Sequence, residues 1–389
     1  MVLAGAGSGK TVFLRRLVEE VALCGVPAIV VDCANDLATF DERWPRAPEH
    51  WLHDDAQRAD QFFCQSAMVV WTPGRNDGNP LTLQPIPDLA ALADDPQELA
   101  TAVAMVSDSL RAIVAPGTSL AANSKHGILV SSLTYFAQSG GGNLDRYIDL
   151  LNDLPVQAGL GVNAEQKLAK QIADRLKVEK ATNPLLHTAG AELDPAVLFG
   201  DDLPRPHTRI SVINFTGLPN LEQQRRFLNQ LAMQLFSWIR KHPHPPNRPL
   251  RGLLVIDEAR DFVPSQKTSV CKDNLIQLTA QARKYHLGLV FATQNPKDID
   301  IKIITNCTTH VYGKANAPAS IDVIKEQLQA KGGSGNGISL LQPGQFYVHN
   351  ADLMLKAPVK VVVPMCLSRA PASPLEQSAI LHKARALAP

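Results

Sequence analysis

The sequence predicts an α/β fold in which helices flank a mainly parallel sheet. One observation is a series of continuous apolar runs that end in polar residues, at 28–32, 253–256 and 287–292. Such runs are typical of strands that are buried on both faces of a parallel sheet. A second observation is the glycine-rich segment 4–11, which stands directly before an expected helix. The length of 389 residues is enough for one large α/β domain that carries an insertion.

Strand and helix alternate near both ends of the chain, whereas the middle is mostly helical. Strands are expected at 2–3, 28–32, 67–71, 209–215, 253–256, 287–292, 310–312, 345–349 and 359–363. Helices are expected at 11–23, 97–114, 125–138, 144–151, 164–178, 221–240 and 374–386. The helix at 221–240 shows an apolar stripe with helical spacing, formed by Leu228, Leu231, Ala232, Leu235 and Ile239.

These elements divide the chain into four parts. Residues 1–85 are the first part of the core, and residues 86–200 are an α-helical insertion. Residues 201–365 complete the core, and residues 366–389 form a C-terminal tail. Only three residues precede the glycine-rich segment, fewer than the five or so of an ordinary buried strand. We therefore expect the chain to be a fragment that lacks an N-terminal domain.

Composition excludes some classes of protein. Hydrophobic residues make up 45% and charged residues 19%, as in ordinary globular proteins. No apolar run reaches the roughly 18–20 residues of a membrane span, and no secretory signal is present, so a cytoplasmic location is expected. The six cysteines form no CxxC pair, which indicates reduced thiols and gives no sign of a zinc site. The net charge of +1 argues neither for nor against nucleic acid.

The segment Ala4-Gly5-Ala6-Gly7-Ser8-Gly9-Lys10-Thr11 fits the Walker A pattern, except that Ala4 replaces its first glycine. The glycines let consecutive backbone N–H groups turn inward around phosphate oxygens. The helix that follows adds the partial positive charge of its N-terminus. We expect Lys10 to reach the β- and γ-phosphates and the hydroxyl of Thr11 to hold Mg²⁺. The alternative is a glycine-rich turn without a ligand.

A second pattern, of Walker B type, ends at residue 258. Four apolar residues at 253–256 are followed by Asp257 and Glu258. We expect Asp257 to hold the magnesium through water and Glu258 to polarise the attacking water as a general base. The alternative is a buried strand that ends in two surface acids.

A third strand, at 289–292, ends in Thr293 and Gln294. In P-loop motors the strand beside Walker B commonly ends in a polar residue that senses the γ-phosphate. Gln294 is the first choice for this role and Thr293 the second. The alternative is a simple strand cap before Asn295 and Pro296.

With these motifs the chain resembles the HerA/FtsK superfamily of P-loop NTPases, whose core is RecA-like, and within it the HerA-like ATPases. The segments that carry the resemblance, beyond the three motifs, are 31–37, 71–74 with 79–81, 257–259 with 262–264, 282–285 with 287–288, 293–296, and 306–309 with 312–314.

The resemblance implies a hexameric ring that binds ATP and Mg²⁺ between subunits and passes double-stranded DNA through its channel. It also implies a cation that acts across the subunit boundary. Lys314 stands where the family has this arginine, so either Lys314 or Arg283 is the candidate, or Lys314 is only a solvated lysine. By analogy with the family, a nuclease or another effector is a possible partner, in DNA processing or in defence against foreign DNA.

Two readings of function stay open beside the DNA translocase or helicase. One is an ATPase that energises secretion of protein or nucleoprotein, and the other is an ATP-binding scaffold ring for an effector. The DNA contact is the weakest signal, because the candidate cations form no dense stripe. They are Arg225, Arg226, Lys241, Arg248 and Arg251. The glycine-rich stretch 331–337 is either a channel loop or a solvated linker.

Overall fold

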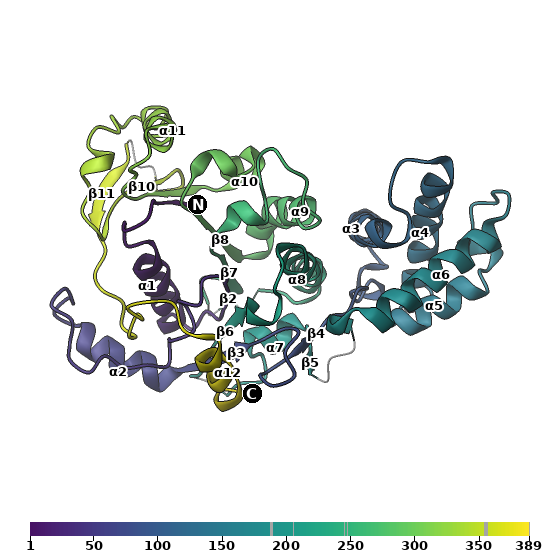
Figure 1. Ribbon diagram of the computed structural model, residues 1–389, viewed down its shortest axis with the longest axis horizontal. Coiled ribbons are helices and arrows are strands. Elements are labelled where there is room, and N and C mark those ends of the chain that lie inside the picture. The colour runs from purple at the N-terminus through teal and green to yellow at the C-terminus, as the bar shows by residue number, and fades with distance from the viewer. Residues whose placement is uncertain (187–189, 205, 245, 247, 354–356, 389) are drawn as a thin grey trace.

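The computed structural model describes residues 1–186, 190–204, 206–244, 246, 248–353 and 357–388. A large mixed sheet lies at its centre, with helices on both faces, and a separate helical lobe extends from one side (Figure 1). Among the described residues, no helix combines the length and the apolar character needed to cross a membrane.

The central sheet has nine strands in the described part of the chain. Their order across the sheet is β11 (Val359–Val362), β10 (Gln345–Asn350), β9 (Thr309–Tyr312), β1 (Val2–Leu3), β8 (Leu287–Thr293), β7 (Gly252–Ile256), β2 (Ala28–Asp32), β6 (Thr208–Asn214) and β3 (Ser66–Trp71). All neighbouring strands from β9 to β3 pair in parallel, and β10 is antiparallel to β9 and to β11. The short β1 lies in the middle of this arrangement, between β9 and β8.

Two hydrophobic cores sit on the two faces of the sheet. Along β2, Ile29 and Val31 belong to one core while Val30 belongs to the other. This alternation explains the continuous apolar runs of the sequence, because successive side chains of a strand point to opposite faces and here both faces are covered. The prediction of a parallel sheet with helices on both faces is confirmed.

The helices divide between the two faces (Figure 1). One face carries α1 (Lys10–Leu23), α2 (Asp55–Gln65) and α12 (Gln377–Ala386). The other face carries α7 (Pro195–Phe199), α8 (Leu221–Lys241), α9 (Lys272–Ala282) and α10 (Ile301–Asn306). The remaining helix of the core, α11 (Pro318–Gln329), lies near the β10 and β11 end of the sheet.

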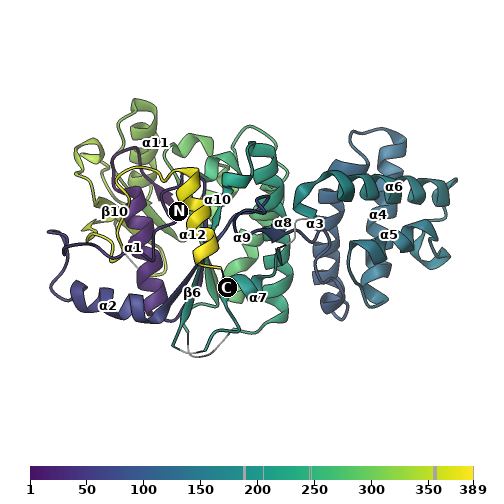
Figure 2. The same ribbon diagram turned by 60° about the horizontal axis from the view of Figure 1, so that its bottom comes forward.

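The helical lobe consists of α3 (Pro96–Val114), α4 (Leu120–Gln138), α5 (Leu144–Asn152) and α6 (Glu165–Thr182). Figures 1 and 2 both show it set to one side of the sheet. At its base, β4 (Leu81–Thr82) pairs in parallel with β5 (Ala191–Glu192), so the chain leaves and returns at one place. The sequence predicted these helices within the interval 86–200, whose bounds as a domain stay a prediction.

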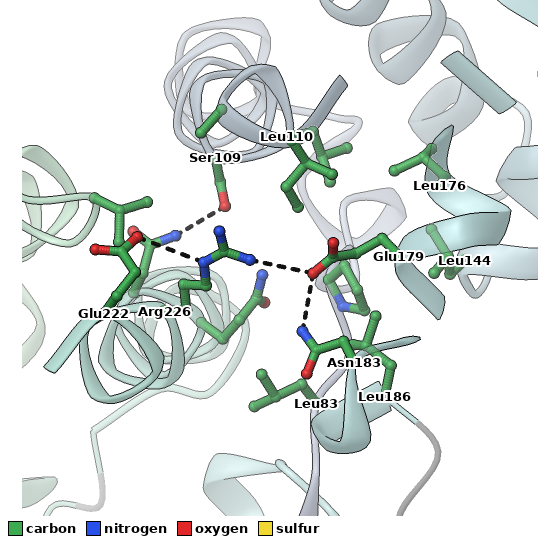
Figure 3. A pocket seen from close by; sticks show the side chains of 16 residues that line it. Leu83, Ser109, Leu110, Leu144, Leu176, Glu179, Asn183, Leu186, Glu222 and Arg226 are labelled. Atoms are coloured by element: carbon green, nitrogen blue, oxygen red, sulfur yellow. Dashed lines mark hydrogen bonds and ion pairs between the residues drawn. The ribbon is translucent and has the colours of Figure 1, made fainter. Parts of the chain in front are cut away.

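Polar side chains join the lobe to the core along α8, around a pocket between α3, α6 and α8 (Figure 3). The amide of Asn229 donates to Ser109 Oγ of α3 at 2.8 Å and accepts from Asn274 Nδ2 of α9 at 2.7 Å. One turn earlier on α8, Arg226 Nη1 lies 3.3 Å from Glu179 Oε1 of α6. Helix α8 therefore connects the lobe to the helices that cover the sheet.

Candidate functional site

The site lies where four parallel strands end at the same edge of the sheet. The glycine-rich segment follows β1, and Asp257 and Glu258 follow β7. Gln294 follows β8, and Asp36 lies in the turn after β2. The carboxyl ends of parallel strands are the usual place for a ligand site in open α/β sheets. The fold thus brings together three motifs that lie as far as 290 residues apart in the chain.

The glycine-rich segment forms a tight loop between β1 and α1. Gly5 N–H donates to the carbonyl of Lys314 at 2.8 Å, and Ser8 N–H donates to the carbonyl of Gly5 at 3.2 Å. Gly7 and Gly9 have φ angles of 72° and 89°, which side chains rarely adopt. Among the described residues, the N–H groups of Gly7 and Gly9 find no acceptor. A loop of this shape presents its amides to an anion at the start of α1.

Lys10, the first residue of α1, points at the two acids that follow β7. Its Nζ lies 2.5 Å from Asp257 Oδ1 and 2.8 Å from Glu258 Oε1. Burial acts to lower the pKa of Lys10, but the two carboxylates outweigh burial and raise it above its ordinary value. Lys10 is therefore a permanent cation held between the loop and the acids.

Glu258 occupies a strained position at the exit of β7. Its φ is 49°, in the left-handed region that non-glycine residues seldom occupy. Its Oε1 accepts from Lys10 and also from Gln294 Nε2 at 2.9 Å. Burial acts to raise the pKa of Glu258, yet hydrogen bonding from Lys10, with a further contribution from Gln294, lowers it below its ordinary value. An ionised carboxylate held in this way is suited to orient and polarise a water molecule.

The structure separates the two choices for the residue after β8. Gln294 reaches the Glu258 carboxylate, whereas Thr293 is fully buried and its hydroxyl contacts the Asn295 backbone. Gln294 therefore has the geometry expected of the sensing residue, and Thr293 has that of a strand cap. The sensing role of Gln294 stays a prediction.

One residue of the site was missed by the sequence motifs. Thr11 Oγ1 donates to Asp36 Oδ2 at 3.0 Å, so a third carboxylate lies beside the start of α1. The sequence offered only a weak signal, namely an acid in the turn after a buried strand.

Asp36 belongs to a polar network at the ends of β2 and β6. Asp32 is buried, and its Oδ1 accepts from Asp36 N–H at 3.3 Å. Asn214 Nδ2 bridges Asp32 Oδ2 at 3.0 Å and Asn35 Oδ1 at 2.8 Å. Burial, followed by repulsion from Asp36, raises the pKa of Asp32 to about 6. The network fixes the turn that carries Asp36.

The site fits a nucleoside triphosphate with a magnesium ion. Three buried oxygens around the loop accept or donate no hydrogen bond among the described residues, namely Ser8 Oγ, Asp36 Oδ1 and Glu258 Oε2. Together with the amides of the loop, they are polar groups that a hydrated ligand can satisfy. In the described part of the chain, no cluster of three or more His, Cys, Asp or Glu side chains suited to bind a metal occurs.

The two candidates for the cation that acts across subunits lie at different places. Lys314 follows β9 and touches the loop of its own chain through its carbonyl oxygen. Arg283 lies just before β8, at the opposite edge of the sheet, where Nη2 is 3.3 Å from Asp352 Oδ1. Within one chain the structure therefore brings Lys314, but not Arg283, next to the other predicted site residues.

Several of the cations suggested for DNA contact are engaged within the chain. Arg225 Nε donates to the Asp261 carbonyl at 2.7 Å, and Arg226 pairs with Glu179. Further pairs join Lys241 to Asp88 at 2.8 Å and Arg251 to Asp201 at 3.1 Å. These contacts give no support to a common cationic stripe.

Comparison with solved structures confirms the predicted fold. The bacterial conjugative coupling protein TrwBdeltaN70, in its unbound monoclinic form, aligns with a TM-score of 0.54 and 13% identity over 96% of this chain and 87% of its own. The plasmid coupling protein TrwB in complex with ADP and Mg²⁺ aligns with a TM-score of 0.53 and 13% identity, over 95% of this chain and 86% of its own. The complex of TrwB with the ATP analogue ADPNP aligns with a TM-score of 0.55 and 14% identity, over 96% of this chain and 86% of its own. No known protein family and no curated protein matches the sequence.

These alignments cover nearly the whole chain, and so they include the helical lobe as well as the sheet. The chain has a RecA-like P-loop fold, with the helical lobe between β4 and β5.

Proposed function

We propose that this chain is an Mg²⁺-dependent ATPase that moves double-stranded DNA. The observation that carries the ATPase part is the chain of contacts from Lys10 through Glu258 to Gln294, all within 2.9 Å. These contacts support the roles that we propose, with Lys10 as the phosphate-binding cation, Glu258 as the general base and Gln294 as the sensing amide.

Each residue has a distinct task in hydrolysis. The amides of the loop and Lys10 bind and orient the β- and γ-phosphates. Thr11 and Asp257 would hold the magnesium ion, which would neutralise charge on the phosphates. Glu258 orients a water molecule in line with the γ-phosphate and takes its proton. Gln294 is the sensor of the γ-phosphate, because its amide donates a hydrogen bond to Glu258, the residue that orients the water.

A pocket beside the first turn of α1 offers room for the base of the nucleotide. Its walls include Gly9, Val12, Trp51, Pro343 and Val363. The walls are largely apolar, as expected of a surface that packs against a purine ring.

The comparisons support a role in DNA transport. TrwB is a conjugative coupling protein, and its structures include complexes with ADP and Mg²⁺ and with an ATP analogue. A likeness over 96% of this chain makes a related use of the fold the simplest proposal. The same likeness favours transport of nucleoprotein as the second candidate function.

The proposal includes a homo-hexameric ring in the cytoplasm, with DNA in its channel and a nuclease or effector as a possible partner. In such a ring the cation that completes the site of the neighbouring subunit is Lys314 or Arg283. Arg283 is the better placed of the two for this role, because its side chain is 75% exposed at the far edge of the sheet. Lys314 is better placed to act within its own subunit.

The first test is ATP hydrolysis by the purified protein with and without double-stranded DNA. We expect a rate that rises several-fold with DNA, that is lost in Lys10→Ala, and that falls about 10²–10⁴-fold in Glu258→Gln while ATP binding persists. Lys180→Ala, an exposed lysine of the helical lobe, serves as the matched control. Hydrolysis that is indifferent to DNA would contradict the translocase and favour the scaffold ring.

The second candidate predicts a different stimulation. If the chain energises transport of nucleoprotein, a DNA with a covalently attached protein should stimulate hydrolysis more than the same DNA alone. Equal stimulation by both would argue against that candidate and leave the DNA translocase in place.

A further inference from the structure

We infer that Asp36 is a positioning residue of the magnesium site, which orients the Thr11 hydroxyl toward the metal and holds one metal-bound water. This inference rests on the proposed ATPase function. It adds the carboxylate of Asp36, in the turn after β2, to that of Asp257, which the Walker B pattern supplies to the magnesium site.

The first observation is the direction of the hydrogen bond between the two residues. Thr11 Oγ1 donates its only proton to Asp36 Oδ2 at 3.0 Å, because an ionised carboxylate can only accept. When a hydroxyl donates a hydrogen bond to a fixed acceptor, the lone pairs of its oxygen point away from that acceptor. Those lone pairs are what a metal ion requires, so Asp36 selects the rotamer in which Thr11 can act as a ligand.

The second observation is that the backbone around Asp36 is fixed from several sides. Its N–H donates to the buried Asp32 at 3.3 Å, and its carbonyl accepts from Arg15 Nη1, also at 3.3 Å. Arg15 is itself fully buried on α1, one helical turn beyond Thr11. Asn35, with a φ of 59°, places the carboxylate by a left-handed turn that Asn214 holds from β6. This amount of support is characteristic of a residue whose position matters.

The third observation concerns the other oxygen of the same carboxylate. Asp36 Oδ1 is buried from solvent and has no hydrogen-bond partner among the described residues. A buried carboxylate oxygen without a donor is costly, so it marks a place where a donor belongs. Magnesium usually keeps several of its waters, and a metal-bound water is a strong donor. One of these waters would satisfy Asp36 Oδ1 while Thr11 occupies an inner position.

The test is the Mg²⁺ dependence of ADP binding, measured by calorimetry in wild type, Asp36→Asn and Asp36→Ala. We call the Mg²⁺ concentration that gives half of the maximal enhancement of ADP binding the Mg²⁺ midpoint. We expect this midpoint to rise about 10–100-fold in Asp36→Ala and less in Asp36→Asn, which keeps one acceptor. The affinity for ADP in EDTA should stay at the wild-type value in both. Asp41→Asn is the matched control, since Asp41 lies in the same loop region but pairs with Lys383 at the surface.

A double-mutant cycle with Thr11→Val isolates the contact. If Asp36 acts mainly through the hydroxyl, then Asp36→Asn should shift the Mg²⁺ midpoint much less in the Thr11→Val background than in wild type. This cycle uses the mildest substitution at each position, so that it remains informative if Asp36→Ala does not fold.

Two outcomes would overturn the inference while the ATPase proposal survives. One is an unchanged Mg²⁺ midpoint in Asp36→Ala. The other is an equal loss of ADP affinity with Mg²⁺ and in EDTA, which indicates a role in folding the loop only. Failure of the wild type itself to bind ADP would instead overturn the proposed function, and this inference with it.

Discussion

The ammonium group of Lys10 lies 2.5 Å from the Asp257 carboxylate, and both side chains are at least nine-tenths buried. Breaking a buried pair of this kind by removing one partner leaves an uncompensated charge. We therefore predict that Lys10→Ala lowers the free energy of unfolding by about 3 kcal/mol, besides abolishing hydrolysis. Urea denaturation without nucleotide measures this loss.

The control for Lys10 is Lys180→Ala, which removes a solvent-exposed pair with Asp145 in the helical lobe. That change should cost less than about 1 kcal/mol, because exposed ion pairs are worth little. In addition, Mg²⁺ should restore part of the stability of Lys10→Ala, since the metal can replace the missing cation beside Asp257. A Lys10→Ala protein as stable as wild type would contradict the prediction.

Gly9 and Gly7 provide a matched pair within one loop. Both have a positive φ, so alanine at either position is strained by about 1–2 kcal/mol. A Cβ at Gly9 would also lie 2.9 Å from the backbone nitrogen of Gly344, whereas a Cβ at Gly7 would meet nothing within 4 Å. We predict that Gly9→Ala is clearly less stable than Gly7→Ala in thermal and urea denaturation. Equal losses of stability in the two variants would show that the backbone at Gly344 moves away from the added Cβ at little cost.

Much of the sheet could be predicted from the sequence because its strands are buried on both faces. The run 28–32 was expected as a strand and is one, and the run 253–256 differs from β7 by a single residue. Asp257, Glu258 and Gln294 were found by their positions after such runs, and Lys10 by the glycine-rich Walker A pattern. The fold brings all four together.

Other elements left weaker patterns. Helix α2 buries only Asp55, Ala59 and Phe62, which is too narrow a stripe to recognise in a polar segment. The C-terminal tail expected at 366–389 has buried contacts with the core, since Glu19 accepts from the N–H groups of Leu367 at 2.6 Å and Ser368 at 2.9 Å. Buried charges of this kind depend on partners some 350 residues away, and no local pattern reveals them.

The same limit applies to the site. Asp36 lies on a turn whose role depends on its contact with Thr11, 25 residues earlier. Its importance follows from the three-dimensional network and not from any spacing in the sequence.

Asn229 is predicted to be the main polar anchor of the helical lobe. It is almost fully buried on α8 and links Ser109 of the lobe to Asn274 of the core. Asn229→Ala leaves both partners unsatisfied, so we expect a loss of about 1–3 kcal/mol. Differential scanning calorimetry would measure it.

A double-mutant cycle distinguishes the anchor from simple loss of packing. With Ser109 already replaced by alanine, Asn229→Ala should cost less than it does in wild type, because one unsatisfied partner has been removed. Additive losses would show that the hydrogen bond to Ser109 contributes nothing of its own. Gln223→Ala, near the start of α8, is the control for changes in helix propensity.

Asp32 should make the stability of the fold depend on pH in a defined window. Burial and the neighbouring Asp36 raise its pKa from 3.8 to about 6 in the folded chain. Between these values the folded chain keeps the proton that the unfolded chain has released, so the free energy of unfolding falls as the pH rises. About one pH unit above the folded pKa the contribution becomes constant, and the whole change, counted from well below pH 3.8, amounts to about 3 kcal/mol.

Asp32→Asn removes this titration and can still accept from the Asp36 amide. We therefore expect the difference in unfolding free energy, wild type minus Asp32→Asn, to fall by about 2 kcal/mol between pH 4 and pH 6.5, measured by urea denaturation at each pH. The exposed Asp94→Asn serves as the control for loss of a carboxylate at the surface. A flat profile for Asp32→Asn would mean that Asn214 and the backbone N–H groups keep the Asp32 carboxylate ionised throughout, and that its burial does not raise its pKa.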